Sequence, residues 1–356
     1  MKRVVIVGAG IVGLWCAVRL AKAGARVTLV EAEGVDVSLW GPGASAAAAG
    51  LLAPLDHQPS AHDGLAFQSL DLWRAGQAGA EWADGVRFDG GIIVAENSEQ
   101  ASALSARAGK LGRHTSPLSG SQFRKRTGFD AKLEHALFVE DEAIADPIRV
   151  MGGLYMQARA HGVALAYGRD ASEVTPRRVT TYEGDVYEAD AVVLAPGIWA
   201  SEDLKLAAPA LGHLRPAKGH LVPVALPTSF RANVRASGFY FARRLQDCVL
   251  GATLEFDAFT RAVDPTRVAE MEAAAGNLLP GQVQTVGQAW TGIRPMSPDG
   301  WPMIGDGGAG VWIAAGHSRN GWLLAPLTGE IVTAYVFGQT IPPEWAALSP
   351  QRFGSP

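Results

Sequence analysis

Residues 4–31 read VVIVGAGIVGLWCAVRLAKAGARVTLVE, and this stretch decides the fold. The β-branched run Val4–Val7 is typical of a buried parallel strand. An apolar pattern of helical spacing follows and ends at Gly24, and a second strand, Val27–Val30, leads to Glu31. Between the first strand and the helix the glycines form a G-x-G-x-x-G motif at Gly8, Gly10 and Gly13. This order of strand, glycines, helix, strand and acid predicts a dinucleotide-binding unit.

Each part of the motif has a physical role. Gly8 permits the tight turn, Gly10 lets a pyrophosphate approach the backbone, and Gly13 allows close packing of helix on strand. The helix N-terminus offers unpaired N–H groups and the positive end of the helix dipole to the phosphates. Glu31 is placed to accept both ribose hydroxyls, and its charge would repel a 2′-phosphate, which argues against NADP. The motif by itself leaves FAD and NAD open.

Composition excludes several classes of protein. The chain has 356 residues, 48% of them hydrophobic, and a net charge of −4 without a basic stripe, so nucleic acid is not expected as a partner. Cys16 and Cys248 are the only cysteines, which argues against disulfides and a metal site. The first strand begins too early for a signal peptide, and no apolar run reaches the ~20 residues of a membrane span. We therefore expect a cytoplasmic protein; a homo-oligomer is compatible with the sequence.

The rest of the chain alternates between two kinds of pattern. A helix is expected from Asp146–Pro147 to His161, with strands at 163–167 and 189–194 and a strand, polar turn and helix near the C-terminus. Pieces that favour β-structure lie at 88–95, 220–226, 238–244 and 248–255. We expect an α/β fold in which a Rossmann-like domain (1–80, 145–215 and 288–356) is interwoven with a mostly antiparallel β-sheet substrate domain (81–144 and 216–287). The alanine run 44–49 is expected to form a helix with a small-residue face.

Three distant motifs make the assignment more specific. They are GASAAAAGLL at 43–52, TGIRPMSPDGWPMIG at 291–305, and AAGHSRNGWLLAPLTG at 314–329. Together with the opening unit they resemble the FAD-dependent amine and D-amino acid oxidase family, with the greatest likeness to its glycine oxidase subgroup, which serves thiamine biosynthesis. The resemblance implies non-covalent FAD. Some members tether flavin through a cysteine near the C-terminal motifs, but no cysteine follows Cys248 here.

The resemblance also implies a set of cofactor-binding residues. The turn at 316–324 would direct backbone N–H groups toward the flavin pyrimidine, where preorganised donors favour hydride acceptance. Without the resemblance, this turn could be an ordinary strand–helix link, and 44–49 a plain packing helix. Val174 would offer its backbone to adenine on the resemblance alone. The full set is Gly8, Gly10, Ile11, Val12, Gly13, Glu31, Ala32, Ser45, Gly50, Leu51, Leu52, Val174, Ala195, Gly197, Arg319, Asn320, Gly321, Trp322 and Leu323.

Three residues are candidates for the substrate site. Arg294 matches the position that binds the substrate carboxylate, since a buried Arg does this through a bidentate fork; the alternative is a structural ion pair. Tyr240 matches a tyrosine that hydrogen-bonds the same carboxylate, and a core tyrosine is the alternative. Arg319 would lie at the flavin edge, or else cap neighbouring carbonyls. His317 is interpreted as structural, and Lys218 has no assigned role.

The implied reaction is oxidative deamination of small amino acids such as glycine, sarcosine and small D-amino acids. A hydride passes to flavin N5, the imine is hydrolysed, and O2 accepts the electrons to give H2O2. Three alternatives stay open: a dehydrogenase with a quinone or carrier acceptor, a non-catalytic nucleotide-binding module, and a secondary-metabolism oxidase of a larger amine. The last is suggested by departures from the family pattern at Ser318, Leu254, Phe256 and Trp301. No role follows from the sequence for the loop 57–63.

Overall fold

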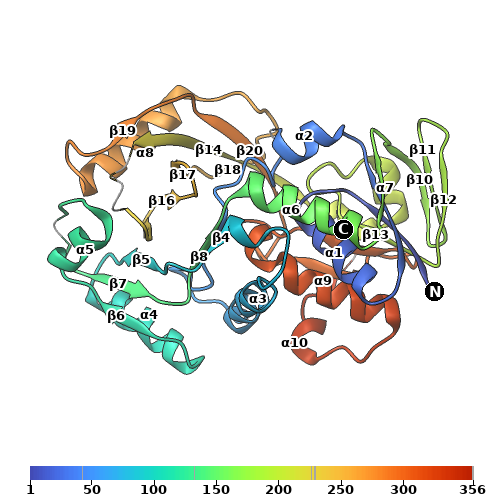
Figure 1. Cartoon of the computed structure of the whole chain (residues 1–356), viewed down its shortest axis with the longest axis horizontal. Coiled ribbons are helices and arrows are strands. Elements are labelled where there is room, and N and C mark those ends of the chain that lie inside the picture. Colours follow the sequence, from blue (N-terminus) through green and yellow to red (C-terminus); the bar gives the residue numbers. More distant parts are fainter. Residues whose placement is uncertain (42, 132, 226, 228–229, 355–356) are drawn as a thin grey trace.

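The computed structural model describes residues 1–41, 43–131, 133–225, 227 and 230–354 (Figure 1). Its opening unit is the one that the glycine motif predicts. Strand β1 spans Arg3–Val7, helix α1 spans Ile11–Lys22, and strand β2 spans Arg26–Glu31. The two strands are parallel, with Val4 opposite Val27 and Val7 opposite Val30. Most of the strand ends differ from the expected positions by one residue.

The opening unit belongs to a six-stranded sheet in the order β21-β22-β13-β1-β2-β9. Strands β9 (Ala164–Tyr167), β13 (Ala191–Leu194) and β22 (Trp312–Ala315) extend the parallel pairing, and β21 (Met303–Asp306) is antiparallel to β22. Because the carboxyl ends of the parallel strands meet at one edge, the segments that follow β1, β13 and β22 converge there.

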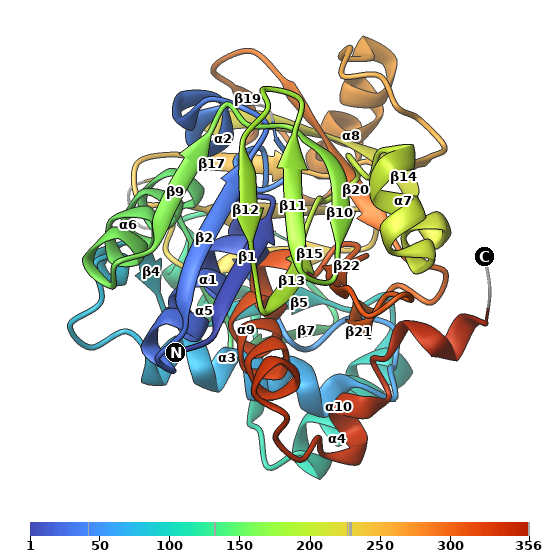
Figure 2. The ribbon, with the colours of Figure 1, turned by 90° about the vertical axis from the view of Figure 1, so that its right-hand side faces the viewer.

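Alternation along the strands divides the core between the two faces of this sheet. Val4 and Ile6 pack against helices, whereas Val5 and Val7 pack on the opposite face. That second face is covered by α7 (Glu202–Ala207) and by a ribbon of β10 (Ala171–Thr175), β11 (Arg178–Thr181) and β12 (Val186–Glu188). Figure 2 looks onto this side, with the ribbon nearest the viewer.

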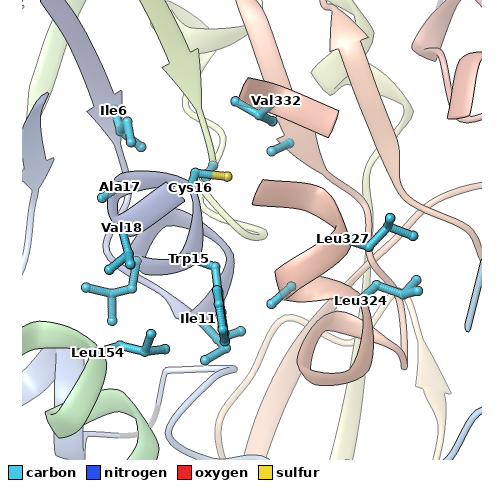
Figure 3. Close-up of a cluster of buried hydrophobic side chains, with 14 of the residues drawn as sticks. Ile6, Ile11, Trp15, Cys16, Ala17, Val18, Leu154, Leu324, Leu327 and Val332 are labelled. Carbon is cyan, nitrogen blue, oxygen red and sulfur yellow. The ribbon is translucent and has the colours of Figure 1, made fainter. Parts of the chain in front are cut away.

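The helical face is built around α1. It packs against α9 (Gly321–Phe337) and α6 (Pro147–Ala160), with α3 (Asp63–Ala75) beyond α9. Figure 3 shows α1 and α9 side by side, with Trp15 and Cys16 of α1 on the side toward α9 and with Leu324 and Leu327 on the far side of α9; all four are buried. Helix α6 begins as the Asp-Pro pair predicts, because the Asp146 side chain accepts a hydrogen bond from the N–H of Arg149 at 3.2 Å.

The second sheet has ten strands and lies beside the first (Figure 1). All its pairings are antiparallel except that of β5 with β15, so the expected combination of a Rossmann-like sheet and a mostly antiparallel sheet is confirmed. Its strands are β5 (Gly91–Val94), β6 (Thr115–Pro117), β7 (Ala136–Val139), β14 (Arg215–Ala225), β15 (Asn233–Ala236), β16 (Phe239–Arg243), β17 (Cys248–Gly251), β18 (Glu255–Phe256), β19 (Gln284–Thr285) and β20 (Trp290–Met296).

Smaller elements complete the chain. A three-stranded sheet joins β3 (Leu51–Leu52), β8 (Ala143–Ala145) and β4 (Val86–Arg87). The other helices are α2 (Val35–Trp40), α4 (Ser98–Lys110), α5 (Gly120–Thr127), α8 (Pro265–Leu278) and α10 (Pro343–Ala346), with 3-10 turns at Ala83–Gly85, Pro209–His213 and Pro350–Phe353. Over the ranges described, no helix combines the length and apolar character needed to cross a bilayer.

Two expectations need correction. The return to the nucleotide-binding part was placed at residue 288, yet Trp290–Met296 pairs along seven residues with β14 and so belongs to the antiparallel sheet. The alanine run 44–49 forms a single turn closed by the N–H of Ala47 on the carbonyl of Gly43, not a helix. The carbonyls of Ser45 and Ala47 instead accept indole N–H groups from Trp322 and Trp290. Of the expected β-piece 220–226, Leu226 lies outside the described residues.

Candidate active site

A cavity of about 870 Å³ lies between the two large sheets and is lined by residues of both. Most of the residues singled out in the sequence meet on its walls, although they are spread over more than 300 positions. Those on the wall are Gly8, Gly10, Ile11, Val12, Glu31, Ala32, Ser45, Gly50, Leu51, Ala195, Gly197, Tyr240, Arg294, Arg319, Asn320, Gly321 and Trp322. Gly13, Leu52, Val174 and Leu323 lie behind the wall.

The glycine turn has no room for side chains. Gly8 has a φ of +104°, and a Cβ atom there would lie 2.3 Å from the carbonyl oxygen of Ala195. A Cβ atom on Gly13 would lie 1.8 Å from the carbonyl oxygen of Gly8. Gly13 therefore acts by letting α1 approach the turn closely, as the motif predicts, and it does so without touching the cavity.

The N-terminus of α1 opens into the cavity. The N-cap residue Gly10 provides no side-chain cap, and the N–H of Ile11 donates to Ser45 Oγ at 3.0 Å. A Cβ atom on Gly10 would lie 3.0 Å from that same hydroxyl oxygen. The cradle of backbone N–H groups and the Ser45 hydroxyl is suited to an anionic group such as a diphosphate.

Glu31 is fixed at the end of β2 with its carboxylate on the cavity wall. One oxygen accepts the N–H of Ala9 at 2.6 Å, and the other accepts the N–H of Glu33 at 3.1 Å. Burial raises the pKa of Glu31 above its usual value, and these two backbone donors oppose the shift. The carboxylate is thus oriented before any ligand binds, with lone pairs left to accept hydroxyl groups.

The C-terminal turn brings a second helix N-terminus to the cavity. Asn320 is the N-cap of α9 and makes no side-chain cap, so the first N–H groups of α9 have no side-chain acceptor from it. The His317 ring does not serve as that acceptor, because its Nε2 lies 2.9 Å from Thr328 Oγ1 in the core. Burial lowers the pKa of His317 to about 3, so the ring is neutral near pH 7.

Arg294 projects from β20 into the cavity, and its guanidinium has no carboxylate partner in the part of the chain that the structure describes. Nη1 donates to the carbonyl oxygen of Thr253 at 3.2 Å, and no acidic side chain of the described residues lies within 4.0 Å. Burial lowers the pKa of this guanidinium, an effect that Tyr240 opposes. The structural ion pair considered as an alternative is therefore not found among the described residues. A half-buried cation at a cavity wall, without a carboxylate partner among the described residues, is suited to an anionic ligand.

Tyr240, on strand β16, lies beside Arg294 of β20. Burial raises the pKa of its phenol, whereas the Arg294 guanidinium lowers it, and the net shift is upward. The hydroxyl group is therefore a hydrogen-bond donor across the ordinary pH range. Two glycines that the sequence reading missed make room for this pair. A Cβ atom on Gly219 would lie 2.2 Å from Arg294 Nη1. A Cβ atom on Gly251 would lie 2.7 Å from the Tyr240 hydroxyl oxygen.

Arg319 lines the cavity near its mouth and pairs with Asp56 at 3.0 Å. Burial opposes ionisation of Asp56, but Arg319 and Arg235 hold the pKa of its carboxyl below the usual value. Asp56 directly precedes the loop 57–63, whose role does not follow from the sequence. Arg107 holds this loop by donating to the carbonyls of residues 56–58 and to Asp63. The loop therefore positions the partner of Arg319.

Several expected positions lie elsewhere than the resemblance implied. Val174 is buried in the core under the six-stranded sheet, and its strand reaches the cavity three residues earlier, at Ala171. Of the departures from the family pattern, Leu254 and Ser318 line the cavity. Phe256 is 60% exposed and off the wall, and Trp301 packs against His62 with ring centroids 4.9 Å apart.

The fold and the cavity define the class of protein. A parallel sheet with a glycine turn, an acid at the end of β2 and a facing antiparallel sheet is the architecture of a dinucleotide-dependent oxidoreductase with a separate substrate wall. A family model described as FAD dependent oxidoreductase matches residues 3–335, and the chain belongs to that family.

Relatives agree with this assignment. The chain is 32% identical to glycine oxidase from Pseudomonas aeruginosa over 369 aligned residues, which cover 95% of each protein. It is 29% identical to D-amino acid dehydrogenase from Rhizorhabdus wittichii over 287 residues, covering 76% of this chain and 62% of the relative. The crystal structure of glycine oxidase from Geobacillus kaustophilus matches with a TM-score of 0.85, 28% identity and 99% coverage of both chains.

The cofactor is therefore FAD, and the residues present fit it. The cradle at Gly10 and Ser45 admits a diphosphate because Gly10 has no Cβ atom, which would lie 3.0 Å from the Ser45 hydroxyl oxygen. Glu31 offers carboxylate oxygens at the ribose position of the motif. Both cysteines, Cys16 and Cys248, are buried in the hydrophobic core, which agrees with non-covalent binding.

Proposed function

We propose that this chain catalyses FAD-dependent oxidative deamination of small amino acids, with glycine, sarcosine and small D-amino acids as the substrate class. The observation that carries the proposal is the guanidinium of Arg294, which is half-buried at the cavity wall without a carboxylate partner among the described residues. An α-carboxylate supplies the missing negative charge and accepts two parallel N–H bonds from the planar fork.

In this proposal the side chains bind and orient the substrate. Arg294 and the neutral Tyr240 hydroxyl hold the carboxylate, and Arg319 shapes the opposite side of the pocket at the cavity mouth. Fixing the carboxylate sets the direction of the α-C–H bond, and such orientation supplies a large part of the rate. His317 is neutral and bonded to Thr328, so it takes no part in proton transfer.

The reaction balances without an added acid or base from the protein. Bound FAD would supply the two-electron acceptor for the hydride of the α-C–H bond. The amino nitrogen loses a proton as the imine forms, and water then converts the imine to an oxo acid and ammonia. O2 takes the two electrons and two protons to give H2O2.

The preference for small substrates is supported by the short side chains and glycines on the cavity wall. Among them are Ala47, Ala48, Gly50 and Ala252. The two relatives named glycine oxidase support the same class of substrate. We further propose that the ten-stranded sheet supplies the substrate wall and the six-stranded sheet the FAD site, and that the protein acts in the cytoplasm.

A second candidate differs only in the electron acceptor. The relative named D-amino acid dehydrogenase supports transfer to a quinone or carrier protein in place of O2. The two candidates separate in a single assay: anaerobic addition of an amino-acid panel to the purified yellow protein, followed by air. Bleaching and rapid return of the flavin spectrum with stoichiometric H2O2 supports the oxidase. Bleaching that persists in air supports the dehydrogenase, and no bleaching with any amino acid rejects both.

A further inference from the structure

Arg261 is a second cation on the cavity wall that the proposed reaction leaves without a role. Five arginines line the cavity, and three of them form ion pairs: Arg169 with Asp185, Arg235 with Glu142, and Arg319 with Asp56. Within the described ranges, Arg261 and Arg294 have no carboxylate oxygen within 4.0 Å. Arg294 is assigned to the substrate carboxylate, so an anionic partner remains to be found for Arg261.

The position of Arg261 points to the cofactor side of the cavity. Its guanidinium lies 4.8 Å from the ring of Trp199, and Phe259 meets that ring edge-on with centroids 5.2 Å apart. Trp199 ends the turn that begins at Ala195, whose carbonyl oxygen contacts the glycine turn at Gly8. Arg261 therefore stands on the side of the cavity where the N–H groups of α1 await a diphosphate.

The segment that carries Arg261 is held from beneath by buried polar side chains. We call residues 257–264 the strap. Thr291 Oγ1 donates to the carbonyl of Arg261 at 2.6 Å, and Lys218 Nζ donates to the carbonyl of Ala262 at 3.3 Å.

The N–H of Asp264 donates to His220 Nε2 at 2.9 Å, so three strap residues are anchored. His220 is fully buried, and Thr291 and Lys218 are 3% and 4% exposed. Buried polar groups of this kind are costly unless they are satisfied, so their bonds specify one course for the strap. The strap also gives a function to Lys218.

We propose that Arg261 binds the diphosphate of FAD and that the strap, held in its course by these buried bonds, covers the cofactor. The diphosphate carries two negative charges, and the N-terminus of α1 supplies only backbone donors and Ser45. The Arg261 guanidinium on that side of the cavity completes the charge balance, while Trp199 and Phe259 cover the cofactor. The inference rests on FAD as cofactor and not on the identity of the amino acid oxidised.

The test measures FAD binding to apoprotein in the absence of substrate, by quenching of flavin fluorescence. R261Q is expected to raise the Kd of FAD about three- to tenfold at low salt, and the difference is expected to shrink toward about 0.5 M salt because an exposed charge is screened. R267Q is the matched control, since Arg267 pairs with Glu270 on α8 and does not line the cavity. An equal Kd in R261Q and R267Q would overturn the proposal.

Two further measurements keep the result interpretable. T291V removes one of the three anchoring bonds of the strap but keeps Arg261, and it is expected to increase the FAD dissociation rate about two- to fivefold. At saturating FAD, R261Q is expected to leave the KM for the amino acid unchanged. A raised KM with an unchanged FAD Kd would mean that Arg261 binds the substrate, and it would contradict the assignment of Arg261 to the FAD diphosphate. Because FAD binding needs no substrate, failure here is distinct from failure of the proposed reaction.

Discussion

The guanidinium of Arg294 occupies the space where a side chain on Gly219 would begin, with Nη1 2.2 Å from the position of a Cβ atom. The two residues lie on paired strands of the ten-stranded sheet, β20 and β14. A methyl group at Gly219 would meet only the far end of a flexible side chain, so it should move the guanidinium without breaking the sheet.

G219A tests this relationship. We expect the KM for the amino acid to rise about tenfold or more because the bidentate fork loses its alignment. FAD content and the unfolding midpoint should stay close to those of the parent protein. G276A on α8 is the control, because nothing lies within 4 Å of that Cβ position. An unchanged KM in G219A would mean that the observed position of Arg294 is not the one that binds substrate.

Removal of the Tyr240 hydroxyl should weaken carboxylate binding. We expect Y240F to raise KM by about ten- to a hundredfold, the worth of one hydrogen bond to a charged group, with a smaller change in kcat. Because burial raises the pKa of Tyr240, the parent protein should show no loss of binding from this phenol below about pH 10. Y182F is the control, since Tyr182 is 66% exposed and bonded to Asp203. Equal kinetics of Y240F and the parent would remove Tyr240 from the pocket.

Neutralising Asp56 should change substrate selectivity. D56N leaves Arg319 without its carboxylate, so the cavity mouth gains an uncompensated positive charge. We expect kcat/KM for D-aspartate to rise several-fold relative to that for D-alanine, because the second carboxylate finds a partner. D299N, which disturbs the pair of Asp299 with Arg352 outside the cavity, should leave the ratio unchanged. A ratio that is the same in D56N and D299N would contradict the placement of Arg319 at the pocket.

His317 should make the protein sensitive to acid. Its folded-state pKa, about 3, lies below the unfolded value near 6.5, so between these pH values the unfolded chain binds the extra proton. Stability therefore falls as the pH drops below about 6.5, by up to about 1.4 kcal/mol per pH unit from this residue. Urea unfolding at a series of pH values checks this. H317Q retains an N–H donor for Thr328, and its stability should fall less steeply with decreasing pH. Parallel stability curves for H317Q and the parent protein would refute this role of His317.

The nucleotide-binding part of the fold could be predicted from the sequence because its signals are local. The glycines, the helical spacing and Glu31 lie within one stretch, and the Asp146–Pro147 pair marks its helix directly. The helix predicted for the alanine run 44–49 is wrong because the carbonyls of Ser45 and Ala47 accept hydrogen bonds from tryptophans about 280 and 240 residues away in the sequence. No local pattern reveals such partners.

The substrate wall was only partly predictable for the same reason. Arg294 and Tyr240 were found through the family motifs, whereas Gly219, Gly251 and Thr253 act on them across strands that are distant in sequence. A glycine inside a strand pattern is a general sign of close approach, and Gly219 in PAKGH carries that sign. What approaches the glycine is decided by strand register, which the sequence does not display.

The central claim is that Arg294 holds the carboxylate of the substrate against the flavin. Its most direct test is the anaerobic rate of flavin reduction by amino acids compared with the same amines lacking a carboxylate, glycine against methylamine and D-alanine against ethylamine, in the parent protein and in R294M. We predict fast reduction by at least one amino acid, reduction at least about a hundredfold slower by its decarboxylated partner, and loss of this preference in R294M with FAD still bound. Equal reduction by the acid and the amine, or an unchanged preference in R294M, would contradict the account.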